Sequence, residues 1–147
     1  MPNRHKILLV EDHEDTSDLL VLLLQQLNYE VATAATVNAA WGLAETSDFD
    51  LFVLDSLLPD GDGTDLCKRI RVRDTSTPIL FYSALAYETD TKEALAAGAQ
   101  RVLIKPVDSD VFCQTVTELL NGSNGHNGSQ RSPPGSGQLF PSELTAS

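Results

Sequence analysis

Short apolar runs alternate with helix-like patterns over residues 1–121, and this alternation constrains the fold more than any other feature of the sequence. The runs are rich in branched aliphatic residues and lie at Ile7–Val10, Val31–Thr33, Leu51–Leu54, Ile79–Tyr82 and Val102–Ile104, the second being the weakest. Continuous apolar runs of this length are typical of strands that are buried on both faces of a parallel sheet.

Between these runs, apolar residues recur at helical spacing. The expected helices are centred on residues 20–27, 37–44, 66–70, 88–97 and 112–120, the fourth ended by Gly98 and the fifth entered at Asp108 or Ser109. Five strands that alternate with five helices predict an α/β domain with a doubly wound, five-stranded parallel sheet.

The composition changes after Asn121, which divides the chain into a domain over residues 1–121 and a tail over residues 122–147. Gly, Ser and Pro supply 14 of the 26 residues of this tail. Such a composition predicts a flexible tail or linker without a core of its own. The apolar pair Leu139-Phe140 is its one candidate docking motif.

The charge balance excludes several classes of partner. Acidic residues outnumber basic ones by 21 to 10, for a net charge of -11, and such a surface repels nucleic acid and anionic membranes. No apolar run approaches the ~20 residues of a membrane helix, and Ile7–Val10 is too short for a signal-peptide core. We therefore expect a cytoplasmic protein without direct nucleic-acid or membrane contacts. Cys67 and Cys113 are expected to be buried, reduced thiols.

Polar residues follow the predicted strands at the edge where parallel sheets bind ligands, the carboxyl ends of the strands. Glu11 and Asp12 follow the first run, Asp55 the third, Ser83 the fourth and Lys105 the fifth. Three carboxylates, one hydroxyl and one ammonium group are therefore expected to converge at one edge of the sheet.

Carboxylates that converge in this way need compensation, because two like charges ~4 Å apart repel by roughly 4 kcal/mol at an effective dielectric constant near 20. The cluster must take up protons or hold a cation, and an all-oxygen site with few protein ligands suits Mg²⁺. Together with Lys105 and Ser83, such a cation supplies the groups that stabilise a phosphoryl group in transfer. Asp55 is the best candidate nucleophile, because it lies at the end of the central strand, with the turn at residues 59–61 just beyond it.

Four segments at these strand ends match a known family. They are Leu8–Asp12, Leu54–Gly63, Phe81–Ala84, and Gly98-Ala99 ahead of Ile104–Pro106. Over about residues 5–121 the chain resembles the receiver domain of two-component response regulators, such as the small chemotaxis regulator. The resemblance implies the flavodoxin-like (βα)5 receiver fold.

The resemblance also implies roles for individual residues. Asp55 would accept phosphate from a phosphohistidine on a sensor histidine kinase or a histidine phosphotransfer protein, and acetyl phosphate could replace that donor. Mg²⁺ would be held by Glu11, Asp12, Asp55 and the backbone carbonyl of Leu57. Ser83 and Lys105 would contact the acyl phosphate. Such a protein is a signalling phosphoacceptor that catalyses its own phosphorylation and dephosphorylation, not a turnover enzyme.

Phosphorylation would then change the face formed by helix 88–97, strand 102–104 and the helix that follows residue 108. A downstream protein target would bind this face, and pairing of two phosphorylated copies is an open alternative. The protein would act as a stand-alone receiver or be linked to an output domain absent from this sequence. The Lys105–Pro106 peptide bond is expected to be cis. Val102 stands where the family often has Tyr or Phe, while Glu11 and Ser83 are charge- and hydroxyl-conserving variants.

Other functions fit the residues less well. A flavodoxin-type FMN protein needs a phosphate-binding loop where this chain has Glu11-Asp12. An aspartate-dependent phosphatase usually carries a second Asp at the position of Leu57. A calcium loop starting at Asp60 fails, because Asp65 and Arg71 stand where such a loop has Gly and Glu. The remaining alternative is a receiver-like module that serves only protein contacts.

Overall fold

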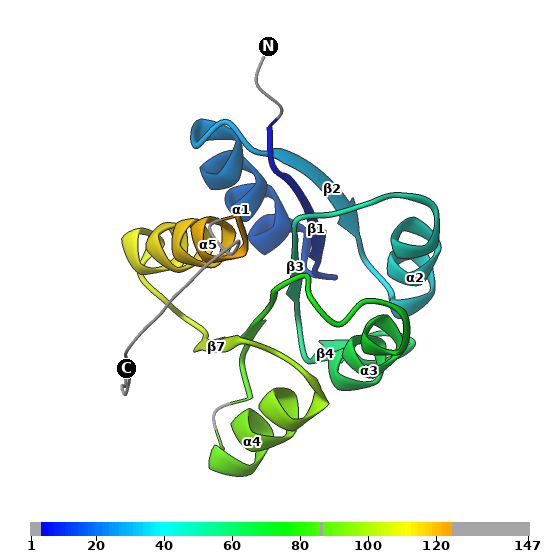
Figure 1. Ribbon diagram of the computed structural model, residues 1–147. Coiled ribbons are helices and arrows are strands. Elements are labelled where there is room, and N and C mark those ends of the chain that lie inside the picture. Colours follow the sequence, from blue (N-terminus) through cyan, green and yellow to red (C-terminus); the bar gives the residue numbers. More distant parts are fainter. Residues whose placement is uncertain (1–3, 86, 125–147) are drawn as a thin grey trace.

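A single parallel sheet forms the centre of the protein in the computed structural model, which describes residues 4–85 and 87–124 (Figure 1). Its five strands run in the order β2-β1-β3-β6-β7, and every neighbouring pair is parallel. The strands are β1 (Lys6–Val10), β2 (Glu30–Ala34), β3 (Leu51–Leu54), β6 (Ile79–Ser83) and β7 (Arg101–Ile104). All five strands predicted from the sequence are confirmed.

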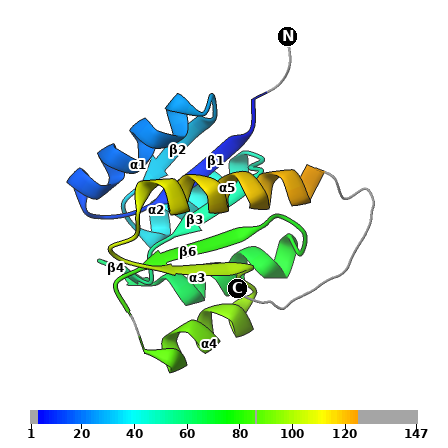
Figure 2. The same cartoon turned by 90° about the vertical axis from the view of Figure 1, so that its left-hand side faces the viewer.

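Helices cover both faces of this sheet. They are α1 (Glu14–Gln26), α2 (Val37–Thr46), α3 (Gly63–Arg73), α4 (Glu88–Ala97) and α5 (Ser109–Asn124). Figure 2 shows α1 and α5 lying across one face, while α2, α3 and α4 pack on the other. The predicted doubly wound α/β fold with five helices is confirmed, and Gly98 caps the end of α4 as expected.

The alternation of side chains along the central strands builds two separate hydrophobic clusters. On β3, Phe52 and Leu54 face α2, α3 and α4, whereas Leu51 and Val53 face α1 and α5. All four residues of β3 are buried. This two-sided burial explains why the central strands appear in the sequence as unbroken apolar runs instead of alternating ones.

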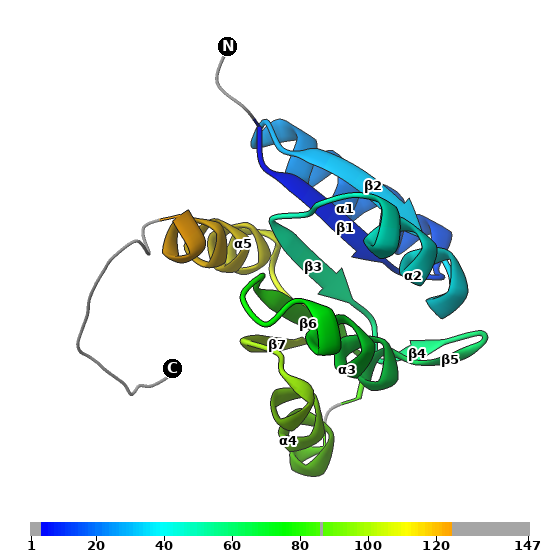
Figure 3. The same cartoon turned by 45° about the vertical axis from the view of Figure 1, so that its right-hand side comes forward.

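A short antiparallel hairpin, β4 (Leu57–Leu58) and β5 (Gly61–Asp62), lies between β3 and α3, where the sequence predicted only a turn. It projects beyond the end of β3 in Figure 3. The Asp60 carboxylate at its tip accepts hydrogen bonds from the backbone N–H groups of Val37 (2.7 Å) and Asn38 (3.0 Å). The hairpin thereby caps the first turn of α2.

The last described element, α5, extends to Asn124. Most of the predicted tail over residues 122–147 therefore lies outside the described residues, which end at 124. Within residues 4–85 and 87–124, no helix has the length and apolar character that crossing a lipid bilayer requires.

Candidate functional site

The carboxyl edge of the sheet holds the polar residues that the sequence placed there. The Asp55 backbone N–H donates to the carbonyl of Val10 (3.0 Å), and the Glu11 N–H donates to that of Ala34 (3.0 Å). Ladder hydrogen bonds thus continue one residue beyond β1 and β3. They hold the backbone of both acidic residues rigidly and side by side.

Glu11, Asp12 and Asp55 form one acidic cluster. Each offers one carboxylate oxygen, and these three atoms lie within 4.8 Å of one another. Glu11 and Asp55 are buried, with 4% and 8% of their surface exposed, whereas Asp12 is exposed. The cluster is therefore buried on the side of Glu11 and Asp55 and open to solvent on the side of Asp12.

Lys105 is the cation that the fold brings to this cluster. Its Nζ lies 2.7 Å from Glu11 Oε1 and 3.4 Å from Asp55 Oδ2. The Lys105 backbone N–H donates to the carbonyl of Ser83 (2.8 Å), which fixes the start of the side chain, and the Lys105–Pro106 peptide bond is cis as expected.

Burial dominates the electrostatics of Glu11. Loss of solvent raises its pKa, and the nearby charge of Asp55 adds to this, against the hydrogen bonds from Lys105 and the His13 N–H. For Lys105, burial alone would lower the pKa, but the hydrogen bond to Glu11 and the charges of Asp55 and Glu11 together raise it. The Lys105 ammonium group is thus held in its charged form, while burial makes the charged form of Glu11 less favourable.

The donor set fits a small divalent cation. With all groups ionised, three carboxylates and one ammonium leave two negative charges uncompensated. Oxygen ligands on one side and solvent on the other are what Mg²⁺ prefers, because it keeps several of its waters. Leu57, the fourth predicted ligand, has its backbone next to the cluster, since its N–H lies 3.4 Å from Asp55 Oδ1.

Ser83 reaches the same edge, but its oxygen is engaged locally. The side chain is buried, and Oγ accepts a hydrogen bond from the Leu85 backbone N–H (3.0 Å). In the described part of the chain, no hydrogen bond uses the hydroxyl proton of Ser83 as donor to the acidic cluster. That proton remains available to a ligand oxygen.

Two residues that sequence reasoning overlooked also shape the site. Lys105 Nζ lies 5.3 Å from the centre of the Tyr82 ring. A Cβ atom on Gly63 would clash with the backbone carbonyl oxygen of Asp55, so only glycine lets α3 start this close to the site. Tyr82 directly precedes Ser83, and Gly63 ends the segment that begins with Leu54. Their positions next to predicted site segments were the only features of the sequence that could have pointed to these two residues.

Among known protein families, the response regulator receiver domain matches residues 7–117 of this chain. The Lactococcus lactis subsp. lactis nisin biosynthesis regulatory protein NisR is 38% identical over 102 residues, covering 69% of this chain and 44% of NisR. The Bacillus subtilis (strain 168) alkaline phosphatase synthesis transcriptional regulatory protein PhoP is 40% identical over 118 residues, covering 80% of this chain and 49% of PhoP. This chain thus spans less than half the length of either relative.

A solved structure supports the same likeness at the level of the fold. A CheY-like response regulator receiver domain protein from Methanospirillum hungatei JF-1 is 26% identical and superposes with a TM-score of 0.82. The match covers 86% of this chain and all of that one. The flavodoxin-like receiver fold expected from the sequence is confirmed by this comparison.

Proposed function

Because the chain belongs to the receiver-domain family of two-component response regulators, we propose that Asp55 accepts a phosphoryl group from a phosphohistidine. The donor would be a sensor histidine kinase or a histidine phosphotransfer protein. The protein then acts as a signalling phosphoacceptor that promotes its own phosphorylation and dephosphorylation.

One observation carries this proposal. Three carboxylates and one ammonium group, from residues far apart in the sequence, meet at one sheet edge, with ligand oxygens within 4.8 Å and Lys105 Nζ 2.7 Å from Glu11. Two of these carboxylates, Glu11 and Asp55, are buried, and buried acids are costly to maintain. The unfavourable burial is understandable if the site binds a divalent cation and a phosphoryl group. The cluster therefore favours a role in phosphoryl transfer over that of a module that serves only protein contacts.

In the proposed reaction, an Asp55 carboxylate oxygen attacks the phosphorus atom of the donor. The new P–O bond forms an acyl phosphate as the P–N bond to histidine breaks, and the electron pair stays with the imidazole, which takes up a proton. Lys105 stabilises charge on the phosphoryl oxygens, and Ser83 donates its hydroxyl proton to one of them. Glu11, Asp12, Asp55 and the Leu57 carbonyl would hold Mg²⁺, which supplies further charge neutralisation when bound.

Acetyl phosphate tests the chemistry without a partner protein. Incubation with Mg²⁺ is expected to add one phosphoryl group, detected by intact mass, and hydroxylamine should release it because acyl phosphates react with that nucleophile. Asp55→Asn should remain unmodified, and removal of Mg²⁺ with EDTA should abolish the reaction. The matched control is Asp62→Asn, which changes an exposed acid of the neighbouring hairpin and should behave like the wild type.

Phosphate on Asp55→Asn, or none on the wild type with Mg²⁺ present, would contradict the assignment of Asp55. A hydroxylamine-resistant phosphate would exclude an acyl phosphate.

The partner face belongs to the same proposal. Large apolar side chains are exposed at Tyr87 (78%), which directly precedes α4, at Leu95 of α4 (46%) and at Val111 of α5 (43%). Exposed aromatic and aliphatic groups favour protein contacts, and the net charge of -11 disfavours nucleic acid. A downstream protein, or a second phosphorylated copy, would bind the face of α4, β7 and α5 in the cytoplasm.

A further inference from the structure

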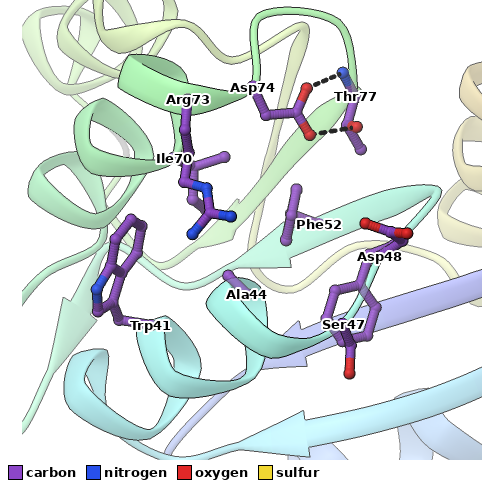
Figure 4. A pocket seen from close by; sticks show the side chains of 10 residues that line it. Trp41, Ala44, Ser47, Asp48, Phe52, Ile70, Arg73, Asp74 and Thr77 are labelled. Carbon is purple, nitrogen blue, oxygen red and sulfur yellow. Dashed lines mark hydrogen bonds between the residues drawn. The ribbon is translucent and has the colours of Figure 1, made fainter.

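A cleft between α2 and α3 lies at the opposite end of the sheet from the acidic cluster. Its volume is about 340 Å³. Figure 4 shows a floor that includes Phe52 and Ile70, with Trp41 and Arg73 on one wall and Asp48 across the opening. The phosphoryl-transfer chemistry proposed above uses none of these residues.

The wall of the cleft places one cation, Arg73, beside the ring of Trp41, and Arg69, which does not line the cleft, lies over the same ring. The guanidinium groups of Arg69 and Arg73 lie 4.4 and 5.8 Å from the centre of the Trp41 ring. Within residues 4–85 and 87–124, neither arginine forms an ion pair with a carboxylate. In a chain with a net charge of -11, these two cations have no anionic partner among the described residues. Trp and Arg side by side are typical of binding surfaces.

Two acids, Asp48 and Asp74, also line the cleft, but neither neutralises the positive charge of Arg73. Asp74 is engaged, because its carboxylate accepts hydrogen bonds from the N–H groups of Ser76 and Thr77 (both 3.0 Å) and from the Thr77 hydroxyl (2.6 Å). Asp48 is exposed and stands away from Arg73 in Figure 4. The cleft therefore suits a segment that places an apolar side chain on the floor and a carboxylate at Arg73.

We propose that residues 139–143 of this same chain, Leu-Phe-Pro-Ser-Glu, dock in the cleft, with Phe140 on the floor and Glu143 at Arg73. These residues lie outside the described part, and their sequence supplies the required chemistry. Residues 125–138 contain no Ala, Val, Ile, Leu, Met, Phe, Tyr or Trp, so Leu139-Phe140 begins the apolar part. Glu143 is the single acidic residue among residues 125–147.

The position of α5 makes this contact reachable. Gly122 of α5 lines a second cavity together with Ser76 and Pro78, and the same loop contributes Asp74 and Thr77 to the cleft. Residues 74–78 span at most about 17 Å. A Gly- and Ser-rich chain of the 14 residues 125–138 has a typical end-to-end distance of about 20 Å. The connecting chain is therefore long enough for residues 139–143 to reach the cleft from the end of α5, and the tether raises their effective concentration there.

Trp41 provides the readout, because it is the only tryptophan in the chain. In the full chain, acrylamide quenching of its fluorescence is expected to rise about twofold in Phe140→Ser, because the linker holds the docking segment near the cleft at an effective concentration in the millimolar range. The matched control is Arg131→Ser, which changes the tail outside the docking segment and should leave quenching unchanged. Neither residue belongs to a described helix or strand, so neither substitution removes a contact from the described fold.

A charge exchange tests the pairing itself. Glu143→Arg should increase quenching, and adding Arg73→Glu to it should restore the wild-type value. A nuclear Overhauser effect between the Phe140 ring and the Trp41 indole should accompany the docked state. Unchanged quenching in Phe140→Ser would overturn the proposal. Protection that grows with protein concentration would also overturn it, because the cleft would then hold the segment of a second copy.

Discussion

At the scale of single residues, Lys105 connects most of the groups at the site. Its ammonium contacts two buried acids and lies 5.3 Å from the centre of the Tyr82 ring. Val102, at the position where the family often has an aromatic residue, instead packs with the cluster under α3 and α4. Tyr82 belongs to the cluster on the other face, against Phe112. The aromatic ring near this site therefore comes from β6 and not from β7.

We expect the Tyr82 ring to position Lys105 for phosphoryl transfer. Tyr82→Leu should slow phosphorylation by acetyl phosphate about two- to five-fold, the equivalent of about 0.5–1 kcal/mol for a cation–π contact. Tyr82→Phe keeps the ring and should react like the wild type.

The pH dependence of the phosphorylation rate distinguishes this positioning of Lys105 by Tyr82 from a mere loss of packing. The ring favours the charged form of Lys105, whose pKa is already raised. Removing the ring lowers that pKa, so the alkaline limb of the rate profile should move to lower pH in Tyr82→Leu only. An equal loss of rate in Tyr82→Phe, or an unshifted limb in Tyr82→Leu, would contradict the prediction.

At the scale of elements, the β4–β5 hairpin joins the proposed phosphorylation site to α2. It follows Asp55 by two residues, and Asp60 at its tip caps the helix with two hydrogen bonds. Thr36 adds a third, since its hydroxyl oxygen accepts from the Ala39 N–H (3.0 Å). A movement of the hairpin would therefore disturb the N-terminus of α2 as well as α3, which directly follows β5.

The cap makes stability depend on pH in a defined direction. The hydrogen bonds from the Asn38 and Val37 N–H groups lower the pKa of Asp60 below its usual value of 3.8. The stabilisation is therefore complete above that usual value and is lost as the pH falls through the lowered pKa of the folded state. In urea titrations between about pH 5 and 2, Asp60→Asn should lose less stability on acidification than the wild type.

The neighbouring acid Asp62 serves as the control for this measurement. Its side chain makes no capping hydrogen bond to α3, so Asp62→Asn should follow the wild-type curve. Parallel curves for the wild type and Asp60→Asn would show that the cap does not stabilise the ionised carboxylate.

At the scale of the whole molecule, the sheet separates two clusters that stabilise the fold from opposite faces. Phe112 of α5 is 1% exposed and packs on Tyr82. Phe112→Ala should lower the free energy of unfolding by about 3–5 kcal/mol, measured by urea denaturation. Val72 of α3 is 88% exposed, so Val72→Ala should change it by less than about 0.5 kcal/mol. Similar losses in both variants would contradict the assigned core.

The sheet edge was predictable because it follows from the strands. Each strand is recognisable in the sequence as an apolar run, and parallel connectivity places the carboxyl ends of all strands at one edge of the sheet. Glu11, Asp55 and Lys105 could therefore be assigned to one site before any coordinates. The hairpin was not predictable in this way, because two strands of two residues each are too short to leave a pattern.

The sequence by itself determined the order of elements and the set of chemical groups at the sheet edge, because hydrophobic periodicity and chain order are local properties. Tertiary structure alone decided which carboxylate Lys105 holds most closely, the engagement of Ser83 Oγ by Leu85, and the meeting of Trp41 with Arg69 and Arg73. These outcomes depend on distances of a few ångströms between elements remote in the sequence. Such distances are set by packing and side-chain rotamers, which no local pattern encodes.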